Sequence, residues 1–175
     1  MRPLALFCLP LIALAVPAAA LAVGGAVGDG TLVVSKGGAP KGVAVVRLVL
    51  DGATVAHLST GSPDQIDTVI IDDPNNTNDI AASATAARKS YADPATGDNI
   101  TKLQGSDFRF RASGGLYKIT IYGSGVDLFA VGQGKVELQG QPTAATPDGR
   151  YSVNGADFRS LPAALTDWLT IKSAG

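Results

Sequence analysis

The chain is short of cysteine, histidine and glutamate, and these shortages exclude several common kinds of protein. Cys8 is the only cysteine of 175 residues and lies in the apolar N-terminal segment, so the rest of the chain has no thiols for disulfides or metal binding. His57 is the only histidine, which excludes a zinc site built on several imidazoles. Glu137 is the only glutamate, and its scarcity beside 21 glycines argues against long helices.

The chain also lacks an excess of basic residues. It carries 14 lysines and arginines against 15 aspartates and glutamates, for a formal net charge of −1. Proteins that bind nucleic acids in general depend on basic excess to neutralise phosphates. The composition therefore argues against nucleic acid as a partner.

Residues 1–22 have the organisation of a signal peptide. Arg2 is the only charge before Asp29, residues 4–16 form an apolar run, and residues 20–22 (Ala-Leu-Ala) fit the pattern of a signal peptidase site. Cleavage there would leave a cysteine-free chain, secreted to the extracellular space or the cell envelope.

The alternative for this segment is an uncleaved membrane anchor. Residues 4–23 are uncharged and close to the roughly 20 residues that a spanning helix needs. Pro10 and Pro17 disfavour a regular helix, so we expect a leader that is removed.

Residues 108–140 alternate apolar and polar side chains, as β-strands do. Phe108 and Phe110 share one face, whereas Arg109 and Arg111 share the other. The alternation is interrupted by glycine clusters, which we interpret as turns, at residues 113–115, 123–125 and 132–134.

The same reasoning extends to the rest of the chain. Asp51-Gly52 is typical of a two-residue hairpin turn. Further strands are predicted at 31–35, 43–50, 54–59, 66–72, 100–103, 151–153 and 165–171, with Phe158 and Leu161 covering the core. Residues 81–89 fit either a short helix or an edge strand, and we favour strand or irregular structure.

These elements predict an all-β fold, an antiparallel two-sheet sandwich of about ten short strands. A closed barrel and a short β-solenoid are the alternatives. Residues 23–175 would form a single domain, within which the polar segment 73–105 is expected to be mobile.

No catalytic motif stands out. The chain has no Gly-x-Ser-x-Gly elbow, since Ser124 lies in a glycine turn, and we expect His57 to lie on an ordinary strand face. A hydrolase would have to use carboxylates such as Asp67, Asp72 or Asp107.

One polar stretch is a candidate calcium site, because hard cations prefer oxygen ligands. Its candidate ligands are Asp72, Asp73, Asn75, Asn78 and Asp79. The spacing is not that of an EF-hand, and such stretches are more often turns, so we expect no cofactor.

Basic and aromatic residues of the predicted strands are candidates for a binding surface. Arg109, Arg111, Lys118 and Lys135 would form a stripe, with Tyr122 and Trp168 as stacking surfaces for a sugar. The alternative is a solvated outer face whose charges prevent sheets from associating edge to edge.

Several motifs in the last 70 or so residues resemble a group of secreted bacterial all-β proteins of similar size. The motifs are Phe108-Arg109-Phe110-Arg111, Gly114-Gly115-x-Tyr117, Gly123-x-Gly125-Val126-Asp127-Leu128, Ala130-Val131-Gly132-x-Gly134 and Tyr151-Ser152-Val153-Asn154-Gly155. The group carries no assigned reaction, cofactor or site. We therefore expect a secreted, non-catalytic envelope or extracellular module, structural or glycan-binding, with the carboxylate-dependent hydrolase as the alternative.

Overall fold

The structure, a computed structural model, describes residues 28–38, 42–77, 79–140 and 149–173. In these ranges the chain forms eleven strands and no helix, and all pairings between strands are antiparallel. Accordingly, no described segment is a helix able to span a membrane. The predicted signal peptide lies outside the described residues. The all-β, antiparallel class is confirmed.

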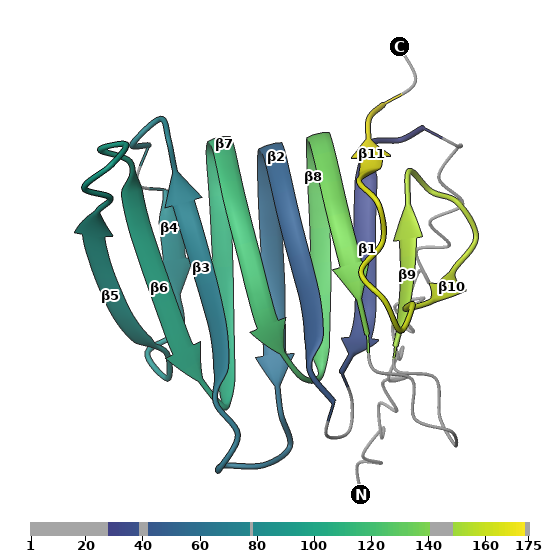
Figure 1. Ribbon diagram of the computed structural model, residues 1–175, viewed down its shortest axis with the longest axis horizontal. Coiled ribbons are helices and arrows are strands. Elements are labelled where there is room, and N and C mark those ends of the chain that lie inside the picture. Colours follow the sequence, from purple (N-terminus) through teal and green to yellow (C-terminus); the bar gives the residue numbers. More distant parts are fainter. Residues whose placement is uncertain (1–27, 39–41, 78, 141–148, 174–175) are drawn as a thin grey trace, which may run out of the picture.

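The strands have the following bounds. They are β1 (Thr31–Gly37), β2 (Ala44–Ser59), β3 (Asp67–Asp73), β4 (Ile80–Ala82), β5 (Ala87–Ala92), β6 (Asn99–Gly105), β7 (Asp107–Gly123), β8 (Val126–Gln139), β9 (Arg150–Val153), β10 (Arg159–Ser160) and β11 (Leu169–Ile171). All belong to one sheet in the order β10-β9-β1-β8-β2-β7-β3-β6-β5, while β11 pairs with β8 and β4 with β7 (Figure 1). The path ends at β10 and β5, so the sheet is not a closed barrel, and the strands are not divided between two separate sheets.

Three predicted turns are wrong, and for one common reason. Asp51-Gly52 lies inside β2, residues 113–115 lie inside β7, and residues 132–134 lie inside β8. The glycines align across the sheet, because Gly52 is paired with Gly115 on one side and with Gly132 on the other. A Cβ atom on Gly52 would lie 2.9 Å from the Cα of Gly132, so the two backbones approach too closely for a side chain. The glycines mark a line across which the sheet bends.

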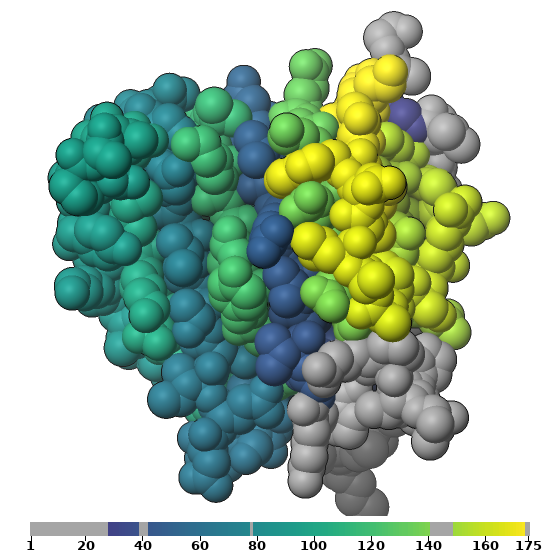
Figure 2. Space-filling view, in the orientation of Figure 1, coloured from purple at the N-terminus to yellow at the C-terminus, as the bar shows by residue number. Residues whose placement is uncertain are grey.

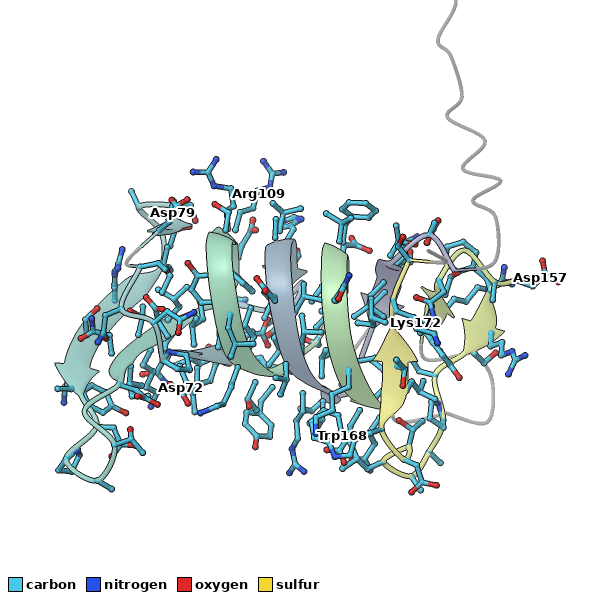
Figure 3. All side chains as sticks on the ribbon, turned by 90° about the horizontal axis from the view of Figure 1, so that it is seen from above. Asp72, Asp79, Arg109, Asp157, Trp168 and Lys172 are labelled. Atoms are coloured by element: carbon cyan, nitrogen blue, oxygen red, sulfur yellow. The ribbon has the colours of Figure 1, made fainter. Side chains whose placement is uncertain are left out.

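The bend folds the sheet over on itself. Leu58 near the end of β2 lies against Gly123, where an added Cβ atom would be 2.8 Å from Leu58 Cδ2. Yet Gly123 pairs with Ala44, at the opposite end of the same strand. An extended strand of this length would hold its ends about 50 Å apart. Figure 3 shows the curvature of β7, β2 and β8 in the view from above.

The core lies between the two halves of this folded sheet. One half, here the front half, contains β5, β6, β3, β11, residues 116–123 of β7, 44–50 of β2 and 134–139 of β8. The rear half contains β4, β1, residues 107–113 of β7, 53–59 of β2 and 126–131 of β8. In Figure 1, β4 is seen behind β3 and β1 behind β11. The buried face of both halves is apolar, with Leu48, Leu58, Phe108, Ile119 and Leu138 among the fully buried side chains.

A bulge in β7 keeps its apolar residues inside across the bend. Phe108 and Phe110 are buried before the bend, at even positions, whereas Tyr117 and Ile119 are buried after it, at odd positions. Gly114 is the extra residue, because Ala53 pairs with Ser113 and Gly52 with Gly115. Its φ of +87° is one that glycine adopts without strain.

The other predicted strands and one predicted turn are present, whereas one predicted core residue is exposed. Strands are found near all the predicted ranges, and the turn at residues 123–125 joins β7 to β8. The polar segment 73–105 holds three strands, β4, β5 and β6, so it belongs to the sheet. Leu161 is buried as expected, but Phe158 is 54% exposed and does not cover the core.

Candidate functional site

A groove on the outer surface of the rear half is the main candidate site. It has a volume of about 610 Å³ and is lined by residues of β1, β2, β4, β7 and β8. Along each strand of the lining, residues that point away from the core alternate with core-facing ones, because successive residues of a strand face opposite sides. We call it the rear groove.

An apolar row forms the floor of the rear groove. Val33 pairs with Phe129, and Phe129 pairs on its other side with Val55, so the three side chains lie next to one another on adjacent strands. Val55 is 44% exposed and Phe129 is 43% exposed. A cluster of large apolar side chains on an outward face is unusual and often marks a binding site.

Two arginines of β7, the strand next to β2, lie beside this apolar row. Arg111 pairs with Val55, and Arg109 pairs with His57. Arg111 Nη2 lies 3.5 Å from Asp79 Oδ1, a long contact between two exposed side chains. Within the described ranges the guanidinium of Arg109 has no ion pair, and it projects outward from β7 in Figure 3. The groove therefore combines an apolar floor with a cation that is available to a ligand.

His57 lies on the outer face of a strand, as expected. Its Nε2 is 2.7 Å from Asp107 Oδ1, and it lies between Asp127 and Arg109 on the neighbouring strands. Ser83 also lines the groove, but its Oγ accepts the backbone N–H of Arg109 from the far side of β7. Two strand spacings, about 10 Å, therefore separate Ser83 from His57, too far for the base of a serine nucleophile.

The structure divides the predicted basic stripe between two opposite surfaces. Arg109 and Arg111 line the rear groove. Lys118, Lys135, Tyr122 and Trp168 lie on the outer surface of the front half, and Figure 3 shows Trp168 on the opposite side of the molecule from Arg109. The single stripe is thus wrong, because the bend in β7 turns the two parts of that strand to different sides.

The cations of the predicted stripe on the front surface are already engaged. Lys118 Nζ lies 2.9 Å from Asp72 Oδ2, and this hydrogen bond raises the pKa of Lys118. Lys135 Nζ lies 4.5 Å from the centre of the Trp168 ring, a cation–π contact. These contacts fit the alternative interpretation, a solvated outer face.

Arg47 belongs to the same front surface and was not a predicted site residue. Its Nη1 lies 3.4 Å from Glu137 Oε2 on β8. Hydrogen bonds to the Tyr122 hydroxyl and to Glu137 raise its pKa. The sequence offered one indication of this position, since Arg47 alone interrupts the apolar run of residues 43–50 and is therefore expected on an outer face.

The candidate calcium ligands do not converge. Asp72 points outward to Lys118, whereas the neighbouring Asp73 is buried and accepts a hydrogen bond from the Thr77 hydroxyl. Asp79 binds Ser113 and Arg111, and Asn75 is exposed. Asn78 lies outside the described residues. In the part of the chain that the structure describes, no three His, Cys, Asp or Glu side chains are grouped for a metal ion.

The three carboxylates considered for hydrolysis also face different ways. Asp67 is buried, Asp72 lies on the front surface, and Asp107 begins β7 in the rear half with its side chain 70% exposed. A glycosidase needs two carboxyl groups that face one another across a substrate. These three form no such pair.

Asp67 is a buried carboxyl group with a raised pKa. Its Oδ1 accepts the backbone N–H of Ser124 at 3.1 Å, but its Oδ2 has no hydrogen-bond partner among the described residues, and neither has the buried hydroxyl of Ser124. Burial raises the pKa of Asp67 to about 6 and outweighs the lowering by the Ser124 N–H. This carboxyl group lies at the turn between β7 and β8, away from the groove lining.

Comparisons with protein-family models, with curated proteins and with solved structures found no match for this chain. A function must therefore be inferred from the chemistry of the site itself.

Proposed function

We propose that the protein is a non-catalytic binding module, secreted to the extracellular space or the cell envelope, that holds an amphipathic anion in the rear groove. The apolar part of the ligand would lie on Val33, Val55 and Phe129. Its carboxylate or phosphate would pair with Arg109. A molecule of this class has both parts that the groove is built to accept.

The observation that carries the proposal is the combination of an exposed apolar row with an arginine that has no ion pair in the described ranges. The groove volume of about 610 Å³ falls in the range typical of small-ligand sites. Each methylene group buried there would contribute about 0.8 kcal/mol. Arginine pairs well with carboxylate and phosphate because its planar donors form two parallel hydrogen bonds.

The side chains considered for hydrolysis do not form a catalytic arrangement. His57 has an acidic partner, but Ser83 lies about two strand spacings away, and the three candidate carboxylates face different sides. These features favour binding over the alternative of a carboxylate-dependent hydrolase.

Calorimetric titration with dodecanoate tests the proposal. We expect Arg109→Gln and Phe129→Ala each to weaken binding about tenfold, because each removes a contact worth about 1–2 kcal/mol. Arg159→Gln and Phe158→Ala are matched controls, since both residues are exposed and lie outside the groove.

Dodecanol separates the two parts of the site. Its binding should depend on Phe129 but not on Arg109, because it has the chain without the charge. Dodecanoate that fails to bind, or that binds equally well after both groove substitutions, would contradict the proposal.

A further inference from the structure

Two lysines face each other at the open edge of the front half. Lys89 on β5 pairs directly with Lys102 on β6. Side chains paired in this way have Cβ atoms about 5 Å apart, and like charges at that spacing destabilise a sheet. Neither lysine has an ion pair in the part of the chain that the structure describes.

Asp72, a carboxylate on the same surface, does not relieve the pair. Asp72 pairs with Ile100, two residues along β6 from Lys102, so it lies diagonally across the strands. Its Oδ2 is engaged by Lys118 Nζ at 2.9 Å. The two positive charges therefore remain without a counter-ion in the described structure.

The lysines border a hollow that is separate from the rear groove. Its volume is about 420 Å³, and its lining contains no carboxylate. The lining residues are Ala87, Arg88, Lys89, Tyr91, Lys102 and Gln104. In Figure 2 this region is the left rim of the front surface, formed by β5 and β6.

Two further side chains supply neutral contacts. Tyr91 is 46% exposed, and Lys89 Nζ lies 5.8 Å from the centre of its ring, at the outer limit of a cation–π contact. Gln104 donates its amide N–H to Thr68 Oγ1 at 3.2 Å, which leaves its amide oxygen as an acceptor. Tyr91 and Gln104 lie on opposite sides of the lysine pair, because Gln104 pairs with Ala87 and Tyr91 pairs with Ile100. An aromatic face suits a sugar ring, and an amide oxygen can accept a hydrogen bond from a sugar hydroxyl.

We propose that the β5–β6 edge binds an anionic saccharide, whose acidic group lies between Lys89 and Lys102 and whose ring packs on Tyr91. This second site shares no residue with the rear groove, so it stands independently of the amphipathic ligand proposed there. The bound anion would neutralise two charges that the fold places side by side. Binding should weaken as salt is added, because both lysines face solvent.

Binding of the full chain to oligogalacturonate, measured by calorimetry, tests the site. We expect the double substitution Lys89→Gln with Lys102→Gln to weaken binding by about tenfold or more, because two charge-assisted contacts are lost. Lys172→Gln removes an exposed lysine elsewhere and should leave affinity within twofold. Equal losses in the double variant and in Lys172→Gln would reduce the effect to net charge and overturn the proposal.

Two tyrosine variants, one in the site and one outside it, test the aromatic contact. Tyr91→Ala should weaken oligogalacturonate binding about fivefold or more, whereas Tyr122→Ala, an exposed tyrosine on the same surface, should not change it. Retained affinity in Tyr91→Ala would contradict the ring contact. Sulfated dextran oligomers distinguish sulfate from carboxylate as the preferred group, and neutral dextran should not bind.

Thermal unfolding gives a readout that does not depend on calorimetry. The double lysine variant should melt at a higher temperature than the wild-type protein, because the repulsion is removed. Oligogalacturonate should raise the melting temperature of the wild-type protein only. A wild-type melting temperature that the saccharide does not change would contradict the site.

Discussion

Replacing Asp67 with asparagine should remove a pH dependence of stability that the wild-type protein carries. The buried carboxyl group has a pKa of about 6, above the ordinary value of 3.8. A raised pKa means that the folded protein binds this proton more tightly than the unfolded chain. The free energy of unfolding should therefore be highest below about pH 4 with respect to this group, fall as the pH rises to about 6, and stay level above that.

The size of the effect follows from the difference between the two pKa values. At about 1.4 kcal/mol for each tenfold change in proton affinity, full burial corresponds to at most about 3 kcal/mol. Part of this change lies below pH 4.5, because the carboxyl group of the unfolded chain, with the ordinary pKa of 3.8, has already lost most of its proton there. We therefore expect about 2 kcal/mol between pH 4.5 and pH 8.

Urea unfolding of the wild-type protein and of Asp67→Asn at pH 4.5 and pH 8 measures this difference. An asparagine retains the acceptor for the Ser124 N–H, and any constant effect of its amide cancels when the two pH values are compared. The variant should gain about 2 kcal/mol relative to the wild-type protein between pH 4.5 and pH 8. Asp64→Asn, at an exposed turn position, is the control and should show no gain. Parallel stability profiles for the wild-type protein and Asp67→Asn would refute the reasoning.

Three further substitutions test the fold by denaturant unfolding. Gly132→Ala should destabilise the protein by about 3 kcal/mol or more, because a Cβ atom would meet the backbone of β2. Gly61→Ala, where φ is +66° but space is open, should cost about 1 kcal/mol. Equal losses of stability in the two variants would contradict the close approach of the backbones. Tyr117→Phe should cost about 1–3 kcal/mol of stability, because the buried hydroxyl of Tyr117 has two hydrogen-bond partners. Tyr122→Phe, on the surface, should cost less than about 0.5 kcal/mol. A negligible loss of stability in Tyr117→Phe would contradict these hydrogen bonds. Leu58→Ala should cost about 3 kcal/mol if the two halves of the sheet pack together, and a loss below about 1 kcal/mol would contradict that packing.

The alternation was sufficient to predict most of the strands, although it left residues 81–89 as strand or irregular structure and gave no sign of β10. It placed Phe108 and Phe110 on one face and Arg109 and Arg111 on the other, and of these four only the phenylalanines are buried. This success has a local cause, since the two-residue period is written into neighbouring positions.

The course of the chain at glycines could not be predicted in the same way. Asp51-Gly52 has the composition of a hairpin turn, but β2 continues through it as one long strand that bends there. Whether a glycine turns the chain or allows two backbones to approach depends on the neighbouring strand, here Gly132 of β8. That neighbour is 80 residues away, so local sequence does not reveal it.

The predicted single stripe of basic residues also depended on contacts that local sequence does not reveal. Arg109 and Lys118 lie on one strand and on the polar side of the pattern, yet the bend directs them to opposite surfaces. The apolar floor was also missed, because Val55 and Phe129 become neighbours only when β2 and β8 pair. Residues that are exposed although apolar cannot be recognised from a pattern that assigns apolar residues to the core.

An NMR titration of the labelled protein with dodecanoate tests the proposed function most directly, because it reports where the ligand lies. The account predicts saturable shifts of the amide signals of Val33, Val55 and Phe129, of the methyl signals of the two valines and of the guanidinium signal of Arg109, with the front surface unchanged. Shifts confined to the front surface, or no saturable shift in the rear groove, would contradict it.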